Sequence, residues 1–238
     1  MAPPPLLRRV AAEAIATFTL VFAGCGAIVA DAHSNGALGA VGVAFAFGLA
    51  IMTMVYATGH LSGAHMNPGV TLAFTVTRHF PLRDALAYIP AQLVGATAAA
   101  GVLCAAWTDK PAHLGATVPT VGAWQAFLYE ALLTALLMFV IMAVATDTRA
   151  VGASAAIAIG GTIGLDALFG GPITGASMNT ARSFGPALLS GEWHDFWIYA
   201  IAPPLGAIGG ALAYQFVRGA GGPEPKQESL TSAGRRLP

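Results

Sequence analysis

Long apolar stretches alternate with short polar segments along the chain. Six of them reach the length of about 20 residues that a helix needs to cross roughly 30 Å of hydrocarbon. Residues 32–77, 85–108 and 196–217 contain no Asp, Glu, Lys or Arg. The pattern therefore predicts an all-α membrane protein. The predicted spans are residues 10–31, 37–59, 83–107, 122–145, 151–171 and 195–217.

Two further apolar segments, residues 67–79 and 179–190, are too short to cross a bilayer.

The composition agrees with a membrane protein, because 9% of the residues are charged whereas soluble domains have about 25%. Eleven basic residues are balanced by eleven acidic ones. This balance argues against nucleic acid as a partner, since no excess of positive charge is available to neutralise phosphates.

The first span has a second interpretation. Arg8 and Arg9, followed by an apolar run that ends at Ala23-Gly24-Cys25, are also typical of a secretory or lipoprotein signal. Glu13 lies inside this run, and further spans follow it. These features favour a first helix that is retained.

The positions of the basic residues predict the orientation of the protein. A cytoplasmic N-terminus places nine of the eleven basic residues on the cytoplasmic side, leaving Lys110 and Arg182 outside. We therefore predict a multi-pass protein of the cell membrane with both termini in the cytoplasm. Residues 219–238, rich in Pro, Gly and Ser, are predicted to form a disordered cytoplasmic tail.

The chain contains an internal repeat. Residues 12–17 recur as residues 129–134, and residues 62–67 recur as residues 174–179, with offsets of 117 and 112. Each copy holds three spans and one short segment, so the second copy enters the membrane from the opposite side. The prediction is a single domain, residues 1–218, whose inverted halves cover about 8–110 and 122–218 and each contain one re-entrant half-helix.

The short segments begin with residues typical of helix N-termini. Asn67 precedes Pro68, which suits the first helical position, and Asn179 precedes Thr180. Both half-helices then point their positive dipole ends at the middle of the membrane, where they repel cations. The residues before each asparagine are predicted to be extended and to present backbone carbonyls to a water-filled cavity. They are Gly63, Ala64, His65, Gly175, Ala176 and Ser177.

Glu13 and Glu130 lie inside spans, where an ionisable residue is a functional candidate. One interpretation is structural: each accepts hydrogen bonds from the backbone N–H groups of the re-entrant loop in its own half. The alternative is a proton-coupled secondary transporter that uses these two residues and Asp166. The placement of one glutamate beside one loop in each half favours the structural interpretation.

No enzyme motif is found. His60 and His65 are five residues apart, so they do not share the helix face that a zinc pair needs. We predict no catalytic residues, no metal site and no cofactor.

The segments Asn67-Pro68-Gly69 and Asn179-Thr180-Ala181 resemble the paired Asn-Pro-Ala signatures of the aquaporin, or major intrinsic protein, family. The resemblance covers residues 8–218 and implies that family's fold and a homotetramer. It also implies that Asn67 and Asn179 donate hydrogen bonds to the passing molecule. Gly69 and Thr180 depart from the usual triplet.

By the same resemblance, the narrow selectivity filter comprises Phe47, Ala167, Ala176 and Arg182. Water-selective members carry His at the position of Ala167, so a small residue there implies a wider filter. The expected function is passive permeation of water and small uncharged solutes, such as glycerol, urea or metalloid hydroxides including arsenite, with exclusion of ions and protons. A narrow water-selective aquaporin is the alternative.

The position after the filter arginine gives a mixed indication. Glycerol channels carry Asp there, whereas this chain has Ser183, as in water channels and the nodulin-like branch. The runs at residues 60–65 and 175–179 are also similar to that branch. We therefore expect a bacterial-type member with nodulin-26-like and aquaglyceroporin-like filter features.

Overall fold

The computed structural model describes residues 4–146 and 154–219. This part of the chain is helical and contains no strand. The start of the predicted fifth span and the predicted tail beyond residue 219 lie outside the described residues. The elements are α1 (Leu6–His33), α2 (Gly39–Ser62), α3 (Pro68–Val76), α4 (Leu82–Ala106), the short 3-10 turn η1 (Pro111–Gly115), α5 (Ala123–Thr146), α6 (Ala155–Thr174), α7 (Thr180–Ser190) and α8 (Phe196–Arg218).

Six helices of the described chain are long and apolar enough to cross a membrane, which confirms the predicted spans. The helices α3 and α7, with 9 and 11 residues, are the two short segments. The first of these ends at Val76 rather than near residue 79. Arg78 has a left-handed φ of 63°, so the chain turns there and leads into α4.

The long helices pack in related pairs. In the first half α1 packs on α4, in the second α5 packs on α8, and α2 packs on α6 across the two halves. A Cβ at Gly95 of α4 would overlap the carbonyl of Ala14, and one at Gly206 of α8 would overlap that of Ala131. Glycine therefore allows the same close approach of backbones in both halves.

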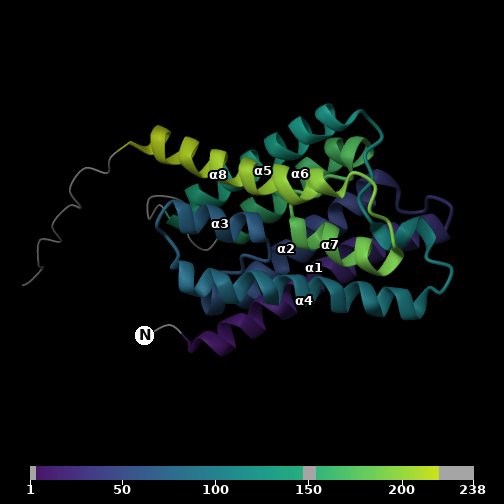
Figure 1. Cartoon of the computed structure of the whole chain (residues 1–238), viewed down its shortest axis with the longest axis horizontal. Coiled ribbons are helices and arrows are strands. Elements are labelled where there is room, and N and C mark those ends of the chain that lie inside the picture. Colours follow the sequence, from purple (N-terminus) through teal and green to yellow (C-terminus); the bar gives the residue numbers. More distant parts are fainter. Residues whose placement is uncertain (1–3, 147–153, 220–238) are drawn as a thin grey trace, which may run out of the picture.

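The half-helices α3 and α7 lie within the bundle, each directed toward a different end (Figure 1). The starts of α1 and α4 lie together at one end of the bundle, where Arg9 and Asp84 form an ion pair of 2.7 Å. The end of α8 reaches the same end, since Gln215 donates to the carbonyl of Thr77 after α3. At the other end, Lys110 donates to the carbonyl of Leu189 on α7.

Candidate pore and selectivity filter

Asn67 and Asn179 cap the two half-helices. The Asn67 side-chain oxygen accepts a hydrogen bond from the N–H of Gly69 at 2.8 Å. The Asn179 oxygen accepts from the N–H groups of Ala181 and Arg182, at 3.0 and 3.2 Å. Both asparagines have extended backbone and so direct the following residues into a helix.

The amide groups of these asparagines also join the two re-entrant loops. The Asn67 amide donates to the carbonyl of Met178 at 2.6 Å, and the Asn179 amide donates to the carbonyl of Met66 at 2.8 Å. Both asparagines line one internal cavity. An amide NH₂ has two hydrogens, so each asparagine keeps a second donor for a molecule in that cavity.

The loops before the asparagines are not extended as the sequence predicted. Their φ angles are left-handed at Gly63, Ala64 and Met66, and again at the equivalent Gly175, Ala176 and Met178. The physical reason is that consecutive N–H groups must converge on one carboxylate in each half. Of the six predicted carbonyl residues, five line the cavity: Gly63, Ala64, His65, Ala176 and Ser177. Gly175 is not among them and packs against Thr117.

Glu13 is buried and holds the first loop. One carboxylate oxygen accepts from the hydroxyl of Ser62 at 2.7 Å and from the N–H of His65 at 2.9 Å. The other accepts from the N–H of Met66 at 2.7 Å and from the side-chain amide of Gln92 at 2.9 Å. Four donors therefore satisfy this carboxylate inside the protein.

Glu130 makes the equivalent contacts in the second half. One oxygen accepts from the hydroxyl of Thr174 at 2.7 Å and the N–H of Ser177 at 2.9 Å, and the other accepts from the N–H of Met178 at 2.8 Å. Glu13 and Glu130 do not line the cavity. Their geometry suits the support of a loop and does not expose either carboxylate to the cavity.

Sequence reasoning missed two tyrosines that also support the loops. Tyr88 donates to the carbonyl of Ser62 at 2.8 Å, and Tyr199 donates to the carbonyl of Thr174 at 2.6 Å. They are 111 residues apart, the same offset as Gly95 and Gly206, so extending the internal repeat into the last span of each half aligns them.

The four predicted filter residues come together along the cavity. Arg182 donates to the carbonyl of Gly115 at 2.7 Å, and its guanidinium carbon lies 4.9 Å from the centre of the Phe47 ring. Arg182 is only 2% exposed, yet its Nε and Nη2 groups have no hydrogen-bond partner in the described chain. Buried donors without a partner are costly, so these N–H groups are available to a polar molecule in the cavity.

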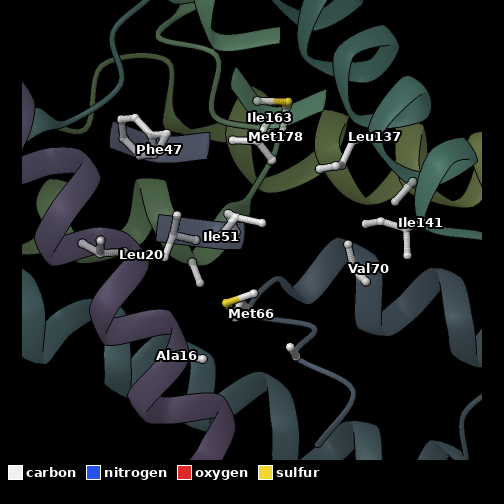
Figure 2. Packing of buried hydrophobic residues seen from close by; sticks show 14 of the residues in the cluster. Ala16, Leu20, Phe47, Ile51, Met66, Val70, Leu137, Ile141, Ile163 and Met178 are labelled. Atoms are coloured by element: carbon white, nitrogen blue, oxygen red, sulfur yellow. The ribbon is translucent and has the colours of Figure 1, made fainter. Parts of the chain in front are cut away.

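A large part of the cavity lining is apolar. Figure 2 shows side chains from α1, α2, α3, α5 and α6 gathered around this region. Such a wall offers no hydrogen bonds, so the groups available to a molecule in the cavity are on the two loops, the asparagines and Arg182. The apolar residues lining it include Leu20, Ile51, Val70, Leu137, Ile141 and Ile163.

Comparison with known proteins identifies the family. The model of the family described as major intrinsic protein matches residues 2–214. The chain belongs to the major intrinsic protein family. It is 49% identical to Aquaporin NIP1-1 of Zea mays over 90% of this chain and 76% of that protein. It is 47% identical to Nodulin-26 of Glycine max over 90% of this chain and 79% of that protein.

A solved structure of the family supports the fold. The X-ray structure of the aquaglyceroporin from Plasmodium falciparum matches with a TM-score of 0.78 and 26% identity, covering 88% of this chain and 96% of that one. The aquaporin fold expected from the sequence is thereby confirmed. The relatives named above are plant proteins, so the comparisons support a nodulin-like member and do not single out a bacterial type.

The structure explains one departure from the Asn-Pro-Ala triplet of this family. Thr180 donates its hydroxyl proton to the carbonyl of Tyr199 on α8 at 3.0 Å. In an uninterrupted helix that carbonyl would accept from the N–H four residues later, but that residue is Pro203, which has no N–H. Thr180 therefore supplies a hydrogen bond that proline at the same position could not.

The remaining predicted residues do not line the cavity. Pro68, Gly69 and Ala181 are buried at the starts of the half-helices and do not line it. Asp166 is fully buried, and neither of its oxygens has a partner in the described chain. Within residues 4–146 and 154–219, no group of three His, Cys, Asp or Glu side chains could hold a metal ion.

Proposed function

We propose that this protein is a channel for passive, gradient-driven permeation of water and small uncharged solutes. The observation that carries the proposal is that the Arg182 Nε and Nη2 groups have no partner among the described residues, in a cavity where two other filter positions are alanines, Ala167 and Ala176. The names of the relatives, aquaporins and an aquaglyceroporin, support the same function.

The hydrogen-bonding groups of the cavity suit a neutral polar permeant. Loop carbonyls accept hydrogen bonds, and Arg182 and the two asparagines donate them, so a hydroxyl or amide group can exchange partners as it moves. Cations are repelled from the cavity, because the positive ends of two half-helices and the charge of Arg182 are directed toward it. Half-helix dipoles and an arginine exclude cations and protons in pores of this kind.

The filter favours solutes larger than water. Alanine at positions 167 and 176 leaves space and no donor, while Phe47 and the apolar wall can contact a carbon backbone. We therefore favour glycerol, urea and metalloid hydroxides such as arsenite as additional permeants. A narrow water-selective channel is the second candidate, favoured by Ser183 after the filter arginine.

A proton-coupled carrier is less compatible with the geometry. Such a carrier needs an ionisable group that meets the substrate or the water path. Glu13 and Glu130 are instead buried, bonded to loop N–H groups and outside the cavity lining.

We infer that residues 1–218 form one channel domain in the cell membrane, with both termini cytoplasmic, and that four copies assemble into a homotetramer. The orientation rests on the basic residues near the end where α1 begins. The exposed Trp124, Trp193 and Trp197 lie near the starts of α5 and α8, and tryptophan is enriched at membrane interfaces.

The test is stopped-flow light scattering on proteoliposomes, comparing water and glycerol permeability. The native protein is expected to pass both above the rates of empty liposomes. Ala167→His should lower glycerol permeability about tenfold or more and leave water permeability within about threefold, because the ring narrows the filter. Ala106→His, at an exposed end of α4, is the control. A native filter that rejects glycerol would favour the water-selective candidate.

A further inference from the structure

Gly24 of α1 lies directly against the Phe47 ring. A Cβ at Gly24 would overlap the Cδ1, Cε1 and Cζ atoms of that ring, the farthest only 2.5 Å away. Gly24 is buried in the interior of α1, and its φ is not positive. Because the helical backbone does not need glycine and glycine is disfavoured there relative to alanine, the space taken by the ring is the reason for glycine at this position.

Phe47 is the only bulky apolar side chain among the four filter positions. Its ring contacts Arg182, which is fixed by its hydrogen bond to Gly115. A ring displaced from Gly24 must therefore move relative to Arg182 and the cavity that both residues line. Gly24 itself does not line the cavity, so its influence on a solute acts through the position of Phe47.

We propose that Gly24 determines the width of the selectivity filter by providing the recess that holds the Phe47 ring. Gly24 is a positioning residue: the missing Cβ allows the ring to withdraw from the path of a solute. This inference rests on the proposed channel function and deepens it, because it adds a residue outside the pore that sets which solutes pass.

Gly24→Ala tests the inference in proteoliposomes. The methyl group should push the ring into the filter, so the ratio of glycerol to water permeability should fall about fivefold or more. Gly26→Ala is the matched control in the same helix, because a Cβ there would meet only Leu103, at an unstrained 3.6 Å. This control should leave the ratio within about twofold of the native value.

Phe47→Ala separates the effect of the ring from a general effect of the helix. If the ring transmits the change, Gly24→Ala combined with Phe47→Ala should match Phe47→Ala alone in its permeability ratio, giving strong non-additivity. If Gly24→Ala does not fold, the double variant should recover folded protein.

Three results would overturn the inference: equal ratios for Gly24→Ala and Gly26→Ala, an effect of Gly24→Ala that persists without the ring, or failure of both Gly24→Ala variants to fold. Native protein with no flux above empty liposomes would instead overturn the proposed function.

Discussion

The two halves of the channel hold their re-entrant loops with the same parts. In each half a buried glutamate accepts hydrogen bonds from two consecutive loop N–H groups. A tyrosine donates to the carbonyl of the last residue of a long helix, and an asparagine caps the half-helix. This shared frame holds both asparagines at one cavity. The frame therefore explains where the protein contacts a solute. It does not explain which solute the protein selects.

The halves differ in the groups beside the frame. In the first half, the His65 ring bonds to Thr71 at 3.1 Å and packs against Phe74, Phe80 and Tyr88. The histidine and its aromatic neighbours form a packed cluster beside the first loop, and His65 and Phe74 also line the cavity.

In the second half, Ser177 takes the place of His65 and bonds to Ser183, which accepts from Thr117 at 2.8 Å. Small hydroxyl groups here leave space for Arg182 and the filter. The comparison teaches that one repeated frame can carry a packed aromatic support in one half and the solute-selecting site in the other.

The largest expected effect comes from removing the carboxylates of the frame. Glu13→Gln and Glu130→Gln each place an amide N–H against a loop N–H, and every buried donor that loses its acceptor in this way costs about 1–3 kcal/mol. The loss should be larger for Glu13 by about 1 kcal/mol, because its second oxygen also accepts from Gln92. The free energy of unfolding in mild detergent measures the loss for each variant. Asp109→Asn, on an exposed loop, is the control.

A greater loss for Glu130→Gln would contradict the comparison, because it would mean that Gln92 adds nothing to the support of the first loop. Equal losses within experimental error would count against it in the same way.

The frame was largely predictable from the sequence, because hydrophobic length, the repeat and the Asn-Pro start are local patterns. The filter was not predictable from the residues alone. Nothing near Gly115 in the sequence marks its carbonyl as the acceptor for Arg182, 67 residues away. The recess at Gly24 likewise exists only when α1 meets α2. The loop conformation was predicted wrongly because extended backbone cannot direct consecutive N–H groups to one glutamate.

An intermediate effect is expected at Thr180, where the second half lacks the proline of the first. Thr180→Pro removes the hydroxyl donor to Tyr199 and should cost about 1–3 kcal/mol of unfolding free energy. Pro203→Ala restores an N–H within α8 for the same carbonyl, so the double variant should recover most of the loss.

Thermal unfolding of the native protein, both single variants and the double variant gives the coupling between the two positions. Additive effects would show that Tyr199 does not link them. Pro203→Ala alone should not destabilise the protein, since the hydroxyl of Thr180 is still present.

The smallest expected effect is at Asp166, which has no counterpart in the first half. Its repeat-related position is Met54, and neither of its oxygens has a partner in the described chain. Asp166→Asn removes a buried group that can carry charge and should raise thermal stability slightly, while changing water and glycerol flux by less than about twofold. If a pH gradient drives uptake by the native protein, and Asp166→Asn loses both this effect and most of the flux, Asp166 would instead lie in a proton path. That result would favour the carrier. Because a channel needs no proton to drive its flux, unchanged permeability across pH gradients in both native and variant proteins is the result expected from the geometry.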